Sequence, residues 1–528
     1  MDTYADNKAE KEFLGVVNEM IGELNESNAF GEETLLRMQN VYRQMSEEKR
    51  EKCLNLLYDV LREDYGVAIY LMSAVLRKTK DKTPIAFIVK LMLDTSFPLW
   101  ERWNDFYQFK IFLFTNCTFG EYELYRDRKR IYESFLEEIK SKLPSCRPAI
   151  PFGERRKKVI VVTFQMINQY HAPTVTVRHI FQCLEQMGYD AECFVCYLRG
   201  MDGSWDWSRA YYGENFIQQT APFEWDMDGV NIKGYNLRLQ GSDYVDTLRR
   251  AVDLIWESKP EYVLEVGSET VLAGLCKEFT TVVGMGMTRN LPVTNAQIIA
   301  CLSEASREER GMWKDLLDAD QSVAFFKMAV HALEEKTAGT LYQRKDFGMP
   351  EDAFVIVIAG NRLDNEINEP FERILFQMLD RQEHAVVEVI GECPEFRERI
   401  LRGTYAGRFY FLGHQKDFKS AIGMGDLFLN PPRQGGGTGG LFAIMEEIPV
   451  VTLGDCDVAE TAGKEFVCKS MEEMPGLVFR YESDAAFMNM QKENCRKEAL
   501  KKTDIDNIRE FWKLHDAVAK YNAREERG

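Results

Sequence analysis

The chain has 528 residues, of which 45% are hydrophobic and 28% are charged, and its formal net charge is −18. This balance is typical of a globular protein, and the length predicts about three or four domains of ~150 residues each. The acidic balance argues against general binding to nucleic acid or to a membrane surface, because no broad basic patch is available. An anionic ligand could bind only where a few Arg, Lys and backbone N–H groups converge.

Twelve cysteines are scattered along the chain. Cys193 and Cys196 form a CxxC inside a run that is typical of a strand, and no second pair completes a zinc set. We therefore expect reduced, buried thiols and a cytoplasmic protein. The first residues, MDTYADNKAEKEF, lack an apolar signal core, and no apolar run approaches the ~20 residues of a membrane span.

The first part of the chain, residues 1–145, is predicted to be an all-α domain. Apolar residues recur there every three or four positions, as in ESFLEEIKSKL. Residues 146–158 contain prolines, a glycine and a basic run, which predicts a linker.

Two α/β domains are expected to follow, at residues 159–345 and 346–503, with a C-terminal helix over 504–528. Short apolar runs, many of them β-branched, alternate with helical patterns, which predicts parallel, doubly wound, Rossmann-like sheets. Such sheets bind ligands in a crevice at the carboxyl ends of their strands. The strands are expected at residues 157–164, 191–198, 261–268, 280–286, 353–360, 385–392, 408–413, 426–432 and 448–453.

A dense glycine cluster stands out in the second of these domains. The stretch NPPRQGGGTGGLFAIMEEIPVV, residues 430–451, places five glycines and Thr438 between a strand and a helix. Glycine lets backbone N–H groups approach an anion at the positive end of a helix, so the chemistry favours phosphate binding. The alternative is that the glycines only allow the helix to pack closely on the sheet. The spacing matches neither a Walker loop nor GxGxxG.

Several motifs together resemble those of GT-B glycosyltransferases, with families 4 and 41 the most similar. The run from RFYFLGHQKD to EEIPVVTL resembles the nucleotide-sugar half of these enzymes, IAGNRLDNEI (358–367) resembles their glycine–arginine turn, and NQYHAPT (168–174) resembles the loop after the first strand. The resemblance covers residues 157 to about 525. The leading all-α part also resembles that of bacterial cytoplasmic protein glycosyltransferases. Taken together, these resemblances imply a GT-B fold, in which two Rossmann-like domains face a cleft. An all-α domain is expected to precede this fold.

The resemblance implies a donor site for a nucleotide sugar, most simply UDP-linked, that needs no metal ion and no cofactor. The glycine turn with Thr438 would hold the diphosphate, and Arg362 would neutralise it as it leaves. A surface arginine paired with a nearby carboxylate is the alternative for Arg362. The expected donor-binding residues are Gly436, Gly437, Thr438, Gly439, Lys416, His414, Arg433 and Asp457.

On the acceptor side, His171 would take the proton of the acceptor, because its ordinary pKa suits general-base work. The alternative is a histidine that only holds its loop. Asn168 and Thr174 are expected to shape the pocket. Neither inverting nor retaining chemistry is fixed, although His171 favours inverting transfer.

One position departs from the family pattern. Related enzymes carry a carboxylate that grips the ribose hydroxyls where this chain has Phe442, so ribose must be held otherwise, for example by Asp455 or Asp457, or nucleotide binding is weakened. The sequence therefore leaves two main hypotheses: a glycosyltransferase with a protein acceptor, or a non-catalytic GT-B-like subunit that binds a partner transferase or its substrate. A sugar-nucleotide epimerase of the same shape is a third, for which the helical domain would have no use.

Overall fold

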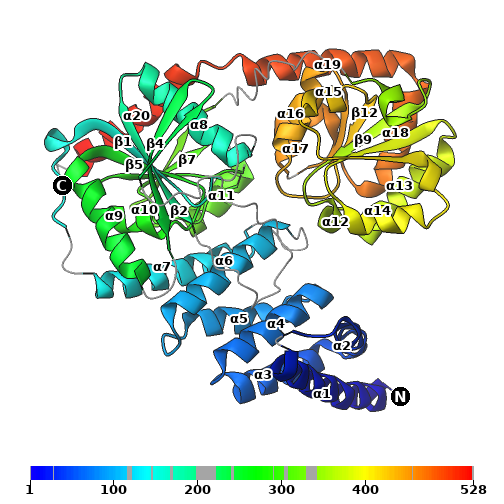
Figure 1. Ribbon diagram of the computed structural model, residues 1–528, viewed down its shortest axis with the longest axis horizontal. Helices are drawn as coiled ribbons and strands as arrows, with labels where there is room; N and C mark the ends of the chain where they lie inside the picture. The colour runs from blue at the N-terminus through cyan, green and yellow to red at the C-terminus, as the bar shows by residue number, and fades with distance from the viewer. Residues whose placement is uncertain are drawn as a thin grey trace.

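The computed structural model describes residues 2–27, 29–115, 122–143, 147–166, 171–197, 222–239, 243–288, 290–302, 307–328, 342–454 and 456–525. A helical part comes first in the chain, and two α/β parts follow it (Figure 1).

The helical part is built from amphipathic helices. In the last of them the buried residues include Tyr132, Phe135, Leu136 and Ile139, which follow the three- and four-residue spacing of one helix face. The Ser46 hydroxyl caps the start of the third helix. The helices are α1 (Asp2–Ser27), α2 (Glu32–Gln44), α3 (Glu47–Leu61), α4 (Tyr65–Thr79), α5 (Thr83–Leu93), α6 (Leu99–Thr115) and α7 (Tyr125–Lys142).

The first sheet has the strand order β3-β4-β2-β1-β5-β6-β7-β8, and among its described pairings only β3–β4 is antiparallel. Its strands are β1 (Arg156–Thr163), β2 (Asp190–Tyr197), β3 (Phe223–Met227), β4 (Val230–Arg238), β5 (Pro260–Val266), β6 (Val282–Met285), β7 (Ile298–Cys301) and β8 (Ser322–Phe325). Its other elements are η1 (Phe152–Glu154), α8 (Ala172–Gln186), α9 (Tyr244–Ser258), α10 (Val271–Cys276) and α11 (Arg307–Leu316).

The first α/β part differs in detail from the sequence-based expectation. Strand β1 begins at Arg156, inside the stretch expected to be a linker. Helix α8 begins at Ala172, and Pro173 lies in its first turn, where a missing N–H costs nothing. The β3–β4 hairpin and strands β7 and β8 were not predicted. The hairpin turns at Asp228 and Gly229, both with positive φ.

The helical part and the first sheet share one hydrophobic core. Buried residues of α5, α6 and α7 pack in the same cluster as residues of β1, β5 and α10. The Tyr132 hydroxyl donates a hydrogen bond of 3.1 Å to the carbonyl oxygen of Thr270, just before α10. A side chain at Gly274 would collide with Tyr132 and Leu136. These contacts fix α6 and α7 against the first sheet.

The second sheet is parallel throughout its described pairings, in the order β11-β10-β9-β12-β13-β14. Its strands are β9 (Phe354–Ala359), β10 (Ala385–Ile390), β11 (Phe409–Gly413), β12 (Leu427–Leu429), β13 (Val450–Leu453) and β14 (Val467–Cys468). Its other elements are η3 (Arg344–Phe347), α12 (Leu363–Glu366), α13 (Glu369–Arg381), α14 (Pro394–Leu401), η4 (Ala406–Arg408), α15 (Phe418–Ile422), α16 (Gly437–Met445), α17 (Asp457–Ala462), η5 (Lys464–Phe466), η6 (Met471–Glu473), α18 (Met474–Ser483) and α19 (Ala485–Thr503).

The chain finally returns to the first sheet through α20 (Asn507–Glu525). Figure 1 shows α19 on the second α/β part, and α20 and the C-terminus on the first. Phe511, Leu514 and Val518 of α20 are fully buried in the core of the first sheet. Nε2 of His515 lies 3.1 Å from the Tyr262 hydroxyl on β5. The last helix therefore ties the two α/β parts together.

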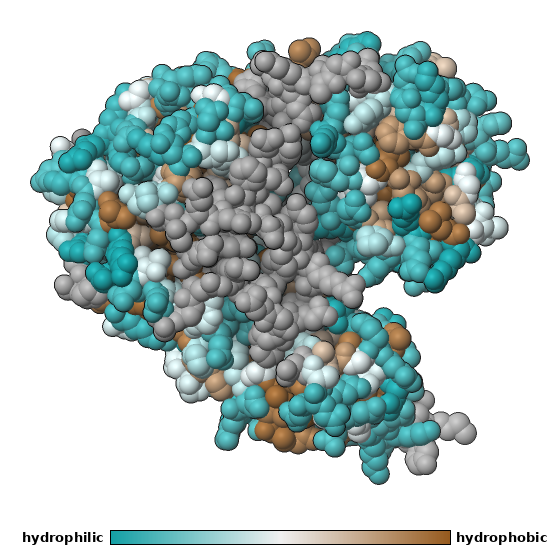
Figure 2. Space-filling model, in the orientation of Figure 1, coloured by the Kyte–Doolittle hydropathy of each residue, from teal (hydrophilic) through white to brown (hydrophobic). Residues whose placement is uncertain are grey.

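The surface is largely hydrophilic on the face drawn in Figure 2, where teal predominates among the residues not shown in grey. None of the described helices is long and apolar enough to cross a bilayer.

Candidate functional site

The centre of the second sheet is its topological switch point. From β9 the chain continues through β10 and β11 on one side, and through β12, β13 and β14 on the other. Ligands of doubly wound sheets bind at the carboxyl ends of the strands at such a point. Arg362 follows β9, and the glycine turn follows β12, so these two features flank the switch point.

The glycine turn has a backbone that only glycine adopts easily. Gly435 and Gly436 have φ angles of 81° and 80°, in the left-handed region. A Cβ at Gly436 would lie 2.6 Å from Nε of Arg433, and a Cβ at Gly437 would lie 2.9 Å from Oγ1 of Thr461. These glycines therefore serve the turn itself, at the N-terminus of α16, where backbone N–H groups have no intrahelical acceptor.

The last two glycines of the cluster have a different role. A Cβ at Gly439 would lie 3.3 Å from the Phe428 ring, and a Cβ at Gly440 would lie 3.0 Å from Val458. Close packing thus explains the second half of the cluster, while the first half forms the turn. The packing alternative therefore applies to Gly439 and Gly440, and phosphate binding at the turn stays a prediction.

An ion-pair network lies directly beneath the turn. Arg433 is buried; its Nη1 donates to the carbonyl oxygen of Ala359 at 2.8 Å and to Oε2 of Glu366 at 2.9 Å. Its Nε donates to Oδ1 of Asn430 at 2.7 Å. Oε1 of Glu366 accepts from Nε of Arg362 at 3.1 Å. Two guanidinium groups therefore share one buried carboxylate, which leaves a net positive charge under the turn.

Arg362 also touches the turn directly. Its Nη2 donates a hydrogen bond of 2.9 Å to the carbonyl oxygen of Gln434, and its side chain is 15% exposed. A Cβ at Gly435 would lie 3.4 Å from the same nitrogen. Among the described residues, Nη1 of Arg362 has no hydrogen-bond acceptor. This arginine is thus fixed beside the turn at the carboxyl end of β9, partly exposed and with Nη1 still able to donate to an anion.

The other predicted donor-side residues surround these groups at different depths. Thr438 is half-buried in the first turn of α16. Asp457 begins α17, and its carbonyl oxygen lies 3.2 Å from the position of a Cβ on Gly437. His414 and Lys416 are exposed in the loop after β11. Arg433, by contrast, is directed into the buried network rather than toward the crevice.

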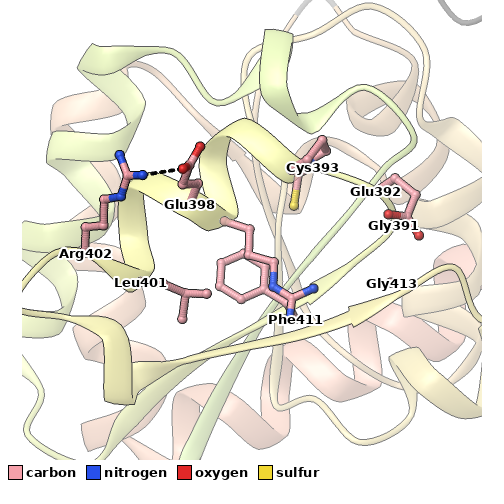
Figure 3. Close-up of a pocket in the computed structure, with 10 residues that line it drawn as sticks. Gly391, Glu392, Cys393, Glu398, Leu401, Arg402, Phe411 and Gly413 are labelled. Atoms are coloured by element: carbon pink, nitrogen blue, oxygen red, sulfur yellow. Dashed lines mark hydrogen bonds and ion pairs between the residues drawn. The ribbon is translucent and has the colours of Figure 1, made fainter.

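A pocket of about 370 Å³ lies at the same edge of the sheet, beside the ends of β10 and β11. Figure 3 shows Phe411 of β11 facing Glu398 and Leu401 of α14. The guanidinium of Arg397 lies over the Phe411 ring, 5.8 Å from its centroid. The volume is within the range of small-molecule sites. An aromatic floor with an arginine suits a flat ring such as a nucleobase.

The pocket was not predicted; the sequence signal that could have revealed it is GECP, residues 391–394.

Close backbone contacts connect the pocket to the switch point. Gly391 donates a hydrogen bond of 2.9 Å to the carbonyl oxygen of Gly413, and Gly360 donates one of 3.0 Å to that of Ile390. Gly391 and Gly360 approach each other so closely that a side chain on Gly391 would collide with the Gly360 backbone. The ends of β11, β10 and β9 thus form one continuous surface from the pocket to Arg362.

Two of the predicted acceptor-side residues, His171 and Thr174, lie at the start of α8 in the first α/β part. His171 caps α8 just after the loop that follows β1. Burial lowers the pKa of His171 to about 4, and its Nδ1 is buried without a hydrogen-bond partner in the described part of the chain. Thr174 is fully buried, and Asn168 lies outside the described residues. No described contact joins His171 to Arg362 or to the glycine turn.

Phe442 lies in the core of the second α/β part and not at the glycine turn. It is 1% exposed and packs edge-to-face on Phe418, with ring centroids 5.6 Å apart. The next carboxylates along the helix are also engaged: Glu446 pairs with Lys419 at 3.1 Å, and Glu447 pairs with Arg496. Asp455, one of the two alternatives for holding ribose, lies outside the described residues. Asp457 is therefore the one predicted ribose ligand that the described structure places beside the turn.

No group of three or more His, Cys, Asp or Glu side chains in the described ranges is arranged to hold a metal ion.

The architecture matches known structures. The chain is similar to a mutant O-GlcNAc transferase of Thermobaculum terrenum, at 13% identity over 98% of each chain, with a TM-score of 0.53. It is also similar to Anabaena HepE in complex with UDP, at 12% identity over 69% of this chain and 100% of that chain, with a TM-score of 0.48. No family model and no curated protein sequence matches the chain. Two Rossmann-like domains form the GT-B fold, here preceded by an all-α domain, and the sequence-based prediction of this architecture is confirmed.

Proposed function

We propose that the protein is a glycosyltransferase that moves a sugar from a nucleoside-diphosphate sugar, UDP-linked, to a protein acceptor. The observation that carries the proposal is the pairing of the left-handed glycine turn with Arg362 at the switch point of the second sheet. The protein to which the chain is similar along nearly its whole length is described as an O-GlcNAc transferase, which supports the reaction class.

The diphosphate would lie over the glycine turn. The free N–H groups of Gly437, Thr438 and Gly439 begin α16, whose dipole favours a negative charge there. The Thr438 hydroxyl adds one more donor. Because Gly435 and Gly436 lack side chains, the chain can turn tightly over Arg433 into the start of α16.

Arg362 would stabilise the leaving diphosphate. Negative charge grows on the phosphate oxygens as the bond to the sugar breaks, and a fixed guanidinium beside them lowers the barrier. Glu366 and the Gln434 carbonyl already hold this guanidinium in place, so little reorganisation is needed. We therefore propose transfer without a metal ion or a cofactor, with the positive charge supplied by Arg362 and the helix terminus.

The nucleobase would enter the pocket between β11 and α14, and His414 and Lys416 would lie beside its mouth. Asp457, which begins α17 next to the turn, would accept hydrogen bonds from ribose hydroxyls.

On the acceptor side, we propose that His171 takes the proton of the attacking group. Burial lowers its pKa to about 4, so the imidazole is neutral at neutral pH but is a weaker base than the ordinary histidine that the sequence led us to expect. Asn168 and Thr174 would shape the loop that carries it. We place the reaction in the cytoplasm, which fits the described cysteines, all of them buried and unpaired.

A non-catalytic GT-B-like subunit is the second candidate, and Phe442 favours it. With an apolar ring at this position, α16 offers no carboxylate to ribose there. Such a subunit could still bind UDP at the glycine turn, but it would neither transfer nor hydrolyse the sugar of a UDP-sugar. Turnover of a panel of UDP-sugars therefore separates the two candidates.

Calorimetric titration of UDP into metal-free protein tests the donor site. We expect micromolar binding, weakened at least tenfold by Arg362→Ala, because a hydrogen bond to a charged group contributes ~1.5–3 kcal/mol. The matched control is Arg373→Ala on α13, whose exposed side chain pairs only with Glu369, and it should bind as the wild type does. Absence of binding by UDP, GDP and ADP alike would refute the transferase proposal.

A further inference from the structure

Helix α6 connects the carboxyl ends of both sheets. Lys110 Nζ donates to the carbonyl oxygen of Ser268 at 3.0 Å and pairs with Glu269 at 2.8 Å, just after β5 of the first sheet. One helical turn later, Phe114 contacts Arg362, just after β9 of the second sheet. In Figure 1, α6 lies below the two α/β parts and one of its ends points toward α12, which Arg362 caps.

The first of these two anchors is a buried, charged one. Glu269 is 5% exposed, has a φ of 54°, and pairs with both Lys110 and Arg128. Burial alone would raise the pKa of Glu269, but the two cations lower it below its ordinary value. Removing either partner from such a buried pair is costly, so the last turns of α6 are held firmly on the first sheet.

The second anchor reaches the proposed donor site itself. The Phe114 ring lies against Arg362, with the guanidinium carbon 4.2 Å from the ring centroid. The same ring lies 3.5 Å from the position that a Cβ on Gly435 would occupy. Phe114 is nevertheless 40% exposed, so it is not an ordinary core residue. It covers one side of the Arg362 guanidinium, while Glu366 and the Gln434 carbonyl bind its edge.

From this geometry we infer that Phe114 is a positioning residue for Arg362 and that the helical domain forms one wall of the diphosphate site. The inference rests on the proposed function of that site. A flexible arginine must give up side-chain freedom when it binds an anion, and a ring that already fixes the guanidinium plane reduces this loss. The helical domain is thus part of the donor site, whatever acceptor it also presents.

The test measures UDP affinity by calorimetry in the wild type and in five variants, one of which is Arg362→Ala. Phe114→Ala should weaken UDP binding about fivefold, the size expected for one cation–π contact. Phe114→Trp should restore the affinity, because a tryptophan ring binds a guanidinium at least as well. Phe479→Ala is the matched control, since this phenylalanine is similarly exposed, at 47%, on α18. The double variant Phe114→Ala/Arg362→Ala should bind no more weakly than Arg362→Ala alone, because Phe114 acts through the arginine.

Two results would overturn the inference. One is unchanged affinity in Phe114→Ala while the wild type binds UDP. The other is an equal loss of UDP affinity from Phe114→Ala whether Arg362 is present or replaced by alanine. This would show that Phe114 does not act through the arginine. If the wild type itself binds no UDP, the proposed function fails and the inference fails with it, and the wild-type titration alone reveals this.

Discussion

Arg433 and Glu366 form a buried ion pair, with 2.9 Å between Nη1 and Oε2, directly beneath the glycine turn. The resemblance to GT-B glycosyltransferases implied that Arg433 contacts the donor, but the structure gives it a supporting position. Its guanidinium binds the ends of β9 and β12 to each other through Ala359 and Asn430. The shape of the turn therefore depends on this pair.

Glu366→Ala should lower the free energy of unfolding of the second domain by about 3–5 kcal/mol, because it leaves two guanidinium groups buried without their carboxylate. Urea unfolding followed by tryptophan fluorescence and circular dichroism measures the effect. Glu369→Ala, three residues further along, removes a carboxylate that is 84% exposed and should change the stability by less than ~0.5 kcal/mol. Equal effects of the two substitutions would contradict the role assigned to the network.

Gly436→Ala should distort the turn. An alanine there must adopt a left-handed φ and place its Cβ 2.6 Å from Arg433, so we expect a loss of ~1–3 kcal/mol in stability together with a large loss of UDP affinity. Gly407→Ala is the control, because its Cβ would meet open space and its φ is ordinary. UDP titration and thermal unfolding of both variants check the prediction, which fails if Gly436→Ala binds UDP normally.

Glu388 should make the protein less stable as the pH rises. This carboxyl group is fully buried on β10, both of its oxygens lack a partner among the described residues, and burial raises its pKa from 4.5 to about 8, against a smaller opposing effect of Arg344. In the unfolded chain the group ionises near its ordinary pKa, so the unfolded state binds fewer protons between pH 4.5 and about 8. The free energy of unfolding should therefore fall across this window, by at most ~1.4 kcal/mol per pH unit.

Glu388→Gln removes this titration and should flatten the pH dependence of urea unfolding between pH 5 and pH 8. Glu398→Gln, at a carboxylate that is 62% exposed, should leave the dependence as in the wild type. Parallel curves for wild type and Glu388→Gln would show that Glu388 does not titrate in this range.

The fold was largely predictable because most of its strands are short apolar runs that can be recognised from local sequence alone. Runs such as KKVIVVTF are apolar on both faces, as buried parallel strands must be, and β1 lies within one residue of the expected range. The β3–β4 hairpin was missed because the strand before its turn at Asp228 and Gly229 is short and contains the polar residues Glu224 and Asp226.

The site was predictable only in part, because sequence order does not reveal where a side chain points. Arg362 and Arg433 look alike along the chain, yet one reaches the crevice and the other is buried. The contact of Phe114 with Arg362 joins residues nearly half the chain apart, so no local pattern could indicate it. The roles of His171, Thr174 and the exposed His414 and Lys416 stay predictions.

His171→Ala should lower the rate of sugar transfer by about 10²-fold or more and leave UDP affinity unchanged, because the proposed base lies on the other domain. Since burial lowers the pKa of this histidine to about 4, kcat/KM of the wild type should fall in acid near pH 4 and not near pH 6.5. A fall in kcat/KM between pH 6 and 7 that disappears in His171→Ala would contradict the lowered pKa of this buried histidine.

A crystal structure of the protein with UDP tests the central claim most directly. The account predicts that the diphosphate lies over Gly435, Gly436 and Gly437, within hydrogen-bond distance of Arg362, and that the uracil occupies the pocket beside Phe411. A diphosphate bound elsewhere, with the glycine turn empty at saturating UDP, would contradict it.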